Sequence, residues 1–233
     1  MDLVEYLDID DDVNVFIVGD IHGDYQGLME ALRSVNFNFM TDMLIGVGDC
    51  VDRGNENEKC FNLLKEHWFK TIKGNHEDFC YKGLLDDHHA FYHKMENNGG
   101  KWFYELPDDI REHVAMRLNK LPVLLEVKYR GKKFGFVHAD VPVEDWELLK
   151  ELVSNNDQHP TQERSIIDMC LWSRDVVNKD YVHIAQVDNV FLGHTVLPEI
   201  KQVGNCTFLD TGGVFRKHSN EYKFSIVNLK DYC

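Results

Sequence analysis

Three short motifs in the first third of the chain combine acidic, amide and imidazole side chains with glycine. They are GDIHG at 19–23, GDCVDRG at 48–54 and GNHE at 74–77, and each follows an apolar run. A single Asp or His after a strand is more often a turn former or a hydrogen-bonded polar residue. Three such motifs in close succession favour one shared chemical site instead.

The residues that could ligate metal ions extend beyond these motifs to two histidines later in the chain. Carboxylate, amide and imidazole groups suit borderline divalent metals such as manganese, iron or zinc, and no cysteine thiolate joins them, which argues against a structural zinc site. Two cations that share one carboxylate can clamp a phosphoryl group and generate hydroxide at neutral pH. We expect Asp49 to be the shared carboxylate. The candidate ligands are Asp20, His22, Asp49, Asn75, His138 and His194.

Strands must position these ligands, because each of five apolar runs ends just before one of them. Four of the five have glycine at the last position, where a missing Cβ lets the backbone turn sharply and approach a ligand. The runs are typical of buried strands. They cover 15–19, 44–48, 69–74, 134–137 and 190–193.

Helical patterns at 25–35 and 56–65 separate the first three predicted strands, and Asn55 with Glu58 fits a capping box at the second helix. The chain therefore opens as β-α-β-α-β, and right-handed crossovers bring the three strand ends to one edge of the sheet. Ligands of open α/β sheets bind at that edge. We predict an α/β fold, a β-sandwich flanked by helices.

The remaining segments are less regular. We expect a surface excursion at 86–106, a helix at 108–120, two strands within 123–138 joined at Arg130-Gly131, and a polar loop over the site at 153–165. Strands at 200–203, 206–209 and near 224–229 suggest an antiparallel tail. Of three nearby histidines, His89 and His93 are one helical turn apart and could hold a metal with His88, but an exposed polar helix face is the favoured interpretation.

Composition narrows the possible partners. With 233 residues, 43% hydrophobic and 28% charged, the chain suits one globular domain spanning 1–233. A net charge of -15 makes nucleic acid a poor partner. No run approaches a membrane span, and six scattered cysteines are typical of reduced thiols in a cytoplasmic protein. We expect Cys50 to be a buried structural thiol.

The motifs also resemble a known family. GDIHG, GDCVDRG and GNHE, with VHAD at 137–140 and LGHT at 192–195, resemble the phosphoprotein phosphatase family of metallophosphoesterases. NGGKWF at 98–103, LPVLLEV at 121–127 and LDTGGVF at 209–215 bring the chain closest to its phage-type branch, the lambda-type serine/threonine phosphatases. The resemblance implies a calcineurin-like fold and hydrolysis of phosphoserine and phosphothreonine in proteins, with phosphotyrosine and small aryl phosphates as further substrates.

The resemblance also assigns roles to the ligands. Asp20 and His22 resemble ligands of a first metal ion, and Asp49 resembles the bridge. The second metal ion would be held by Asn75, His138 and His194. Manganese is our first choice for both ions, with iron or zinc as alternatives, and the implied nucleophile is a hydroxide that bridges them and attacks phosphorus in line.

Four further residues resemble the family's catalytic groups. Arg53 and Arg174 are similar to arginines that clamp the phosphate, although Arg174 could instead cap a helix end at the surface. His76 resembles the general acid and Asp52 its charge partner, with a role for His76 as a third nitrogen ligand left open. Position 24 is Asp where phage-type enzymes usually carry Cys, which leaves substrate preference open.

Two other functions compete with a protein phosphatase. Dinucleoside tetraphosphate hydrolases share the opening motifs, but that branch resembles GDxVARG where this chain has Asp52 before Arg53. A catalytically inactive binding module would keep the fold but is expected to have lost some ligands, and every proposed ligand is present. Turnover of p-nitrophenyl phosphate with and without Mn²⁺ separates an enzyme from an inactive module.

Overall fold

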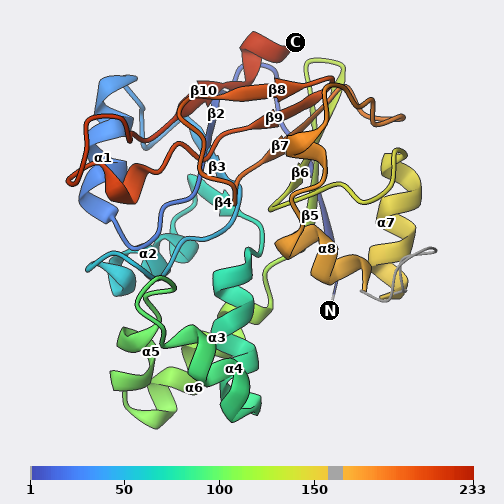
Figure 1. Ribbon diagram of the computed structural model, residues 1–233. Helices are drawn as coiled ribbons and strands as arrows, with labels where there is room; N and C mark the ends of the chain where they lie inside the picture. The colour runs from blue at the N-terminus through green and yellow to red at the C-terminus, as the bar shows by residue number, and fades with distance from the viewer. Residues whose placement is uncertain (1, 157–164) are drawn as a thin grey trace.

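The computed structural model describes residues 2–156 and 165–233, in which two β-sheets lie side by side in the upper half of the molecule (Figure 1). One sheet has the strand order β1-β5-β6-β7-β9-β8 and the other β10-β2-β3-β4. The strands are β1 Val4–Asp8, β2 Val15–Val18, β3 Met43–Gly46, β4 Phe69–Thr71, β5 Leu124–Tyr129, β6 Lys132–Val137, β7 Asn189–Leu192, β8 Lys201–Val203, β9 Cys206–Phe208 and β10 Ile226–Asn228.

The smaller sheet contains the predicted β-α-β-α-β unit. Strands β2, β3 and β4 pair in parallel, so their carboxyl ends lie along one edge. Helices α1 (Tyr25–Ser34) and α2 (Asn57–Asn62) join them and lie on the left of Figure 1. Leu28 and Leu32 of α1 pack against Phe16 and Val18 of β2, which explains the apolar face read from the sequence.

The larger sheet contributes the second set of strand ends. Strands β5 and β6 form a hairpin whose turn, Arg130 and Gly131, has φ of 52° and 72°, as a two-residue turn between right-twisted strands requires. Strands β6, β7 and β9 are parallel, so their carboxyl ends also share an edge. Helices α7 (Trp146–Asn155) and α8 (Ile166–Trp172) lie on the right of Figure 1.

The core between the sheets is apolar and closely packed. Ile17 and Ile45 from the smaller sheet join one buried cluster with Phe134, Phe136 and Phe191 from the larger sheet. None of these five side chains is exposed to solvent. Burial of this kind is the main stabilising contribution in a fold of two packed layers, and it holds the two sets of strand ends in one place.

Helices α3 to α6 form a separate group below the sheets in Figure 1. They are α3 Asn75–Leu85, α4 Asp87–His93, α5 Lys101–Glu105 and α6 Asp108–Asn119. The segment 86–106, predicted as a surface excursion, is largely exposed, but it contains two helices that were not predicted, α4 and α5, and Phe103 within it is fully buried. Two helices of seven and five residues are too short to show a clear 3.6-residue period.

Other local predictions also need correction. Helix α2 starts at Asn57 without a side-chain cap, so Asn55 and Glu58 form no capping box. A strand that was not predicted, β1, precedes β2 in the chain and pairs in parallel with β5. Of the loop expected at 153–165, residues up to Asn155 belong to α7, and 157–164 lie outside the described residues. Short 3-10 turns occur at Leu63–Lys65, Val176–Asn178, Gly213–Phe215 and Leu229–Tyr232.

No helix in the described ranges combines the length and apolar character needed to span a bilayer.

Candidate metal centre and active site

All six predicted ligands lie at the edge where the strand ends of the two sheets meet. Asp20, Asp49 and Asn75 follow β2, β3 and β4, while His138 and His194 follow β6 and β7. Every one of the six is buried, with at most 8% of its surface exposed. Polar side chains this deeply buried need partners that compensate the loss of water, and they find them in one another.

His22 marks the first group of ligand atoms. Its Nε2 lies 3.8 Å from Asp20 Oδ2 and 3.6 Å from Asp49 Oδ2. Its Nδ1 lies 3.1 Å from the carbonyl oxygen of Val51, which can only accept, so the ring proton sits on Nδ1. The Nε2 lone pair therefore faces the two carboxylates, which is the orientation that a metal ligand needs.

The second group is built around Asn75. Its Oδ1 lies 2.9 Å from His138 Nε2 and 2.8 Å from His194 Nδ1. His138 Nε2 is also 3.3 Å from Asp49 Oδ2, while its Nδ1 lies 2.8 Å from the carbonyl oxygen of Val47. Asp49 Oδ2 thus belongs to both groups, as a bridging carboxylate would.

His76 lies beside these groups. Its Nδ1 is 2.8 Å from Asp52 Oδ2, and its Nε2 is 3.9 Å from Asp49 Oδ2. Both His76 and Asp52 are buried. Since a carboxylate only accepts, Nδ1 donates to Asp52 and Nε2 faces the centre. The same position lets His22, Asp49 and His76 offer three ligand atoms to one ion, so the alternative of His76 as a ligand also fits this geometry.

The two predicted arginines differ in their surroundings. Arg53 is partly buried, its guanidinium contacts His22 Nε2, and its Nε donates to the carbonyl oxygen of Asn97 at 3.2 Å. Arg174, just beyond the end of α8, is exposed. It is near enough for its charge to help lower the pKa of His194. The structure therefore brings Arg53 against the ligands and leaves Arg174 more open to solvent.

Comparison with known proteins agrees with this geometry. Residues 13–198 match the family described as calcineurin-like phosphoesterase. The chain belongs to this family. It is a phosphoesterase of the metal-dependent kind, and the resemblance to phosphoprotein phosphatases stated from the motifs is confirmed.

Relatives of this phosphoesterase include proteins named for two different activities. Serine/threonine-protein phosphatases 1 and 2 of Salmonella typhimurium are 32% and 31% identical, over 87% and 91% of this chain and 88% and 94% of those proteins. A symmetrical bis(5'-nucleosyl)-tetraphosphatase of Actinobacillus pleuropneumoniae is 41% identical over 59% of this chain and 48% of that protein.

Solved structures confirm the fold. One assigned as a diadenosine tetraphosphatase superposes with a TM-score of 0.63 at 20% identity, covering 98% of this chain and 95% of the other. A serine/threonine phosphatase from Saccharomyces cerevisiae gives 0.59 at 15% identity, covering 88% and 70%. The predicted metallophosphoesterase fold, with its mixed sheets flanked by helices, is thereby established.

The charge balance of the phosphoesterase site fits a cation. Burial, then Asp210 and Asp49, raise the pKa of Asp20 well above its usual value, and burial raises that of Asp210. Three carboxylates so close together repel one another when ionised, and divalent cations would remove that repulsion. Asp210 lies two residues beyond the end of β9 and was not predicted, although the LDTGG motif contains it.

The three ligand imidazoles differ in protonation. Burial and the Arg53 charge lower the pKa of His22, and burial and His138 lower that of His194 to about 2, so both rings are neutral. Burial acts against protonation of His138 as well, but Asp49 outweighs it and raises the pKa of His138 to about 10. A metal ion held by His138 would therefore have to displace a proton from this ring.

Glu77 of the GNHE motif has a structural role that the motif alone did not indicate. Its carboxylate accepts hydrogen bonds from the backbone N–H groups of Asp49, Cys50 and Gly74 at 2.7–2.9 Å. Burial and the nearby Asp49 raise the pKa of Glu77 to about 7. Glu77 therefore fixes the loop that presents Asp49, and Cys50 beside it is buried as expected.

Backbone conformation marks the site as well. Among the described non-glycine residues, nine have φ in the left-handed region, and five of these are predicted site residues. Such conformations cost about 1–3 kcal/mol each and persist where surrounding structure holds them, most often at functional sites. The five are His22, Asp49, Asp52, Arg53 and His194.

His93 corrects a further prediction. It was expected on an exposed polar helix face with His88 and His89, but its side chain is fully buried. His93 Nε2 lies 2.7 Å from Asp52 Oδ2. The sequence offered no local signal for this contact, because the two residues are 41 positions apart and belong to separate segments.

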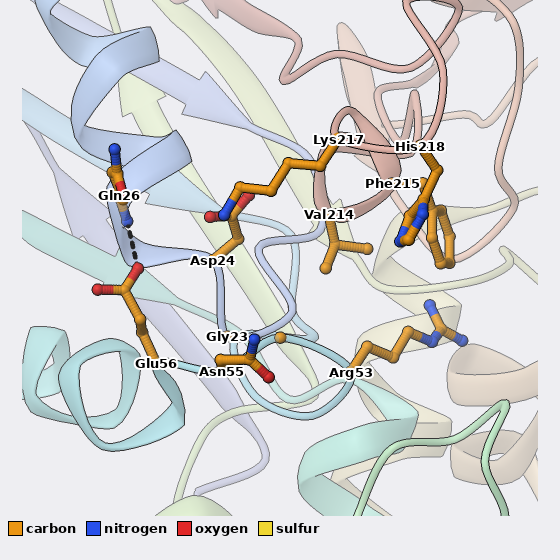
Figure 2. A pocket seen from close by; sticks show the side chains of 11 residues that line it. Gly23, Asp24, Gln26, Arg53, Asn55, Glu56, Val214, Phe215, Lys217 and His218 are labelled. Carbon is orange, nitrogen blue, oxygen red and sulfur yellow. Dashed lines mark hydrogen bonds between the residues drawn. The ribbon is translucent and has the colours of Figure 1, made fainter.

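A cavity of about 220 Å³ adjoins Arg53. Figure 2 shows Arg53, Phe215 and His218 on one side of it, with the Lys217 side chain extending toward Asp24 on the other. Asp24 caps α1 through the N–H of Gly27 and forms an ion pair with Arg216. The position at which this chain departs from phage-type enzymes thus lines a space beside the phosphate-binding candidate.

Proposed function

We propose that this phosphoesterase is a serine/threonine protein phosphatase acting on phosphorylated proteins or peptides. The observation that carries the proposal is the orientation of His76. Asp52 holds its Nδ1 at 2.8 Å, so Nε2 faces Asp49 Oδ2, the atom common to both ligand groups. A proton donor beside a phosphoryl site is what a poor leaving group such as a serine alkoxide requires.

The residues present fit two divalent cations, for which manganese is our choice. Asp20 and His22 would hold one ion, Asn75, His138 and His194 the other, and Asp49 both. When bound, such ions neutralise charge on the phosphoryl group and lower the pKa of coordinated water. The buried carboxylates that raise one another's pKa support such an arrangement.

The chain's own groups supply the other parts of the reaction. Arg53 holds phosphoryl oxygens through a planar guanidinium that can donate two hydrogen bonds at once, and Arg174 adds a second cation from the more exposed side. His76 gives the proton on Nε2 to the departing alkoxide oxygen. Asp52 keeps the opposite nitrogen, Nδ1, protonated and stabilises the imidazolium.

Hydrolysis of dinucleoside tetraphosphates is the second candidate. A tetraphosphatase relative is 41% identical to this chain, but over 141 residues only. The protein phosphatase relatives extend over 85–91% of this chain. The chain also has Asp52, the partner of His76, where the tetraphosphatase branch resembles GDxVARG. These points favour the protein phosphatase.

Parallel assays test the proposal. The protein with Mn²⁺ is given a phosphoserine peptide, a phosphotyrosine peptide and diadenosine tetraphosphate, with matched samples in EDTA. We expect kcat/KM to be highest for the phosphoserine peptide and activity to vanish in EDTA. A higher kcat/KM for diadenosine tetraphosphate would replace the proposal with the second candidate. Absence of turnover on all three substrates and on p-nitrophenyl phosphate would favour an inactive binding module.

A further inference from the structure

The carboxylate of Asp52 is held by three hydrogen-bond donors, and only one of them is His76. His76 Nδ1 and His93 Nε2 lie 2.8 Å and 2.7 Å from Oδ2, while Trp102 Nε1 lies 2.7 Å from Oδ1. The side chains of Asp52, His76 and His93 are at most 1% exposed. Because these side chains are excluded from solvent, each of these hydrogen bonds is stronger than it would be in water.

The protonation of His93 at Nε2 follows from its neighbours. A carboxylate accepts and cannot donate, so the Nε2 that faces Asp52 must carry a hydrogen. The other nitrogen, Nδ1, lies 3.1 Å from the hydroxyl oxygen of Tyr104, which can donate to it. His93 therefore donates to Asp52 through Nε2, and Tyr104 supports the tautomer that this contact needs.

Packing prevents the His93 ring from turning away. Phe79 stacks on it with ring centres 5.4 Å apart and planes within 9°. Gly100 lies so close that a Cβ at that position would be 2.0 Å from the imidazole carbon Cδ2. A glycine is therefore required there by the ring itself. Phe79 from α3 and Gly100 at the start of α5 thus hold the His93 ring of α4 in one orientation.

Among the residues that the structure describes, no further side chain is placed to replace His93 as a donor to Oδ2 of Asp52. Cys80 Sγ lies 4.0 Å from His93 Nε2, and a thiol is a weak donor. Without His93, Oδ2 of Asp52 would keep a single strong donor, His76, and of the three donors only Trp102 on Oδ1 would still oppose rotation of the carboxylate about its terminal torsion, which is broad. The Nδ1 of His76 would then lose the fixed acceptor that orients its ring.

We propose that His93 is a positioning residue for the acid His76 and acts through Asp52. The inference rests on the proposed function, since it assumes that His76 protonates the leaving group. His93 itself touches neither the six candidate ligands nor the pocket beside Arg53. Its removal should therefore impair proton transfer and leave metal binding intact.

The test compares leaving groups in three variants. His93→Leu removes the donor and keeps an apolar side chain, whereas His93→Gln can place an amide N–H near the former Nε2. His88→Asn, on the exposed side of α4, is the matched control. We expect His93→Leu to lower kcat about tenfold on a phosphoserine peptide and less than about threefold on p-nitrophenyl phosphate, whose phenolate leaves without a proton. His93→Gln should recover most of the loss.

A double-mutant cycle decides whether the effect passes through His76. In the His76→Asn background, His93→Leu should cause little further loss on the phosphoserine peptide, because residues that act as one unit are not additive. Equal losses on both substrates, or independent losses in the cycle, would overturn the inference. If the wild-type protein hydrolyses no phosphoester, the proposed function itself is wrong, which is a separate outcome from a wrong role for His93.

Folding is checked by thermal unfolding and by manganese content. If His93→Leu does not fold, Tyr104→Phe takes its place, since it removes only the hydroxyl that donates to Nδ1. We expect a smaller loss with the same dependence on leaving group. A loss of equal size on both substrates would overturn the inference in this variant too.

Discussion

Nδ1 of His76 lies 2.8 Å from Oδ2 of Asp52, and both side chains are buried beside the candidate metal ligands. Burial acts to raise the pKa of Asp52, but His93 and His76 outweigh it and hold that pKa well below its usual value. Asp52 is therefore ionised, and it fixes the direction in which His76 can donate a proton.

Replacement of His76 by Asn should have an effect that depends on the leaving group. A serine alkoxide needs a proton as it departs, whereas p-nitrophenolate does not near neutral pH. We expect kcat to fall more on a phosphoserine peptide than on p-nitrophenyl phosphate, by a further factor of about ten to a hundred. Steady-state kinetics at matched manganese content measure the difference. Equal losses would show that His76 positions the phosphate or ligates metal.

Asp49→Asn should reduce metal binding and activity more than the replacement of any other candidate ligand. Oδ2 of Asp49 is shared by the two ligand groups, so its charge would neutralise both cations. We expect bound metal and turnover to be lost together, as measured by elemental analysis and by hydrolysis of p-nitrophenyl phosphate. Asp12→Asn, on the exposed surface, serves as the control. Two retained metal ions per chain with near-normal turnover would exclude Asp49 as the bridge.

Arg53→Ala should weaken substrate binding and lower kcat without loss of metal. The negative charge on the phosphoryl oxygens persists from the ground state to the transition state, so the guanidinium contributes to both. We expect kcat/KM to fall by about 10²-fold or more, a typical loss for one such donor. Arg130→Ala, in the exposed β5–β6 turn, is the control. An unchanged kcat/KM would place Arg53 outside the site.

Metal binding should release protons and weaken as the pH falls. In the metal-free protein the pKa of His138 is raised to about 10, chiefly by Asp49 acting against burial, and burial raises that of Glu77 to about 7. His138 is therefore protonated at pH 8, and a cation must displace that proton. Calorimetric titration with Mn²⁺ in buffers of different ionisation enthalpy should show release of at least one proton per chain. An affinity independent of pH between 6 and about 9 would contradict this.

Glu77→Gln should loosen the loop that carries Asp49. The carboxylate accepts three backbone N–H bonds, and an amide has one acceptor oxygen for them. We expect a loss of about 1–3 kcal/mol in the free energy of unfolding, together with weaker manganese binding. Urea unfolding and a metal titration test both. A Gln variant as stable as wild type would mean that these bonds contribute little.

Much of the centre was predictable because its residues follow strands directly. Asp20, Asp49 and Asn75 stand after apolar runs with short helical segments between them, and parallel strands leave their carboxyl ends on one edge. The roles assigned to the ligands, the arginines and His76 stay predictions until metal and kinetic measurements are made.

The sequence by itself determined the β-α-β-α-β opening and the chemical types of ligand, since apolar periodicity and local motifs depend on neighbours in the chain. Only the tertiary structure decided that His93 contacts Asp52 and that Asp210 lies near Asp20. These outcomes depend on packing between segments far apart in the chain, and burial decides them. A histidine on a short polar helix has the same local sequence whether that helix faces water or a carboxylate.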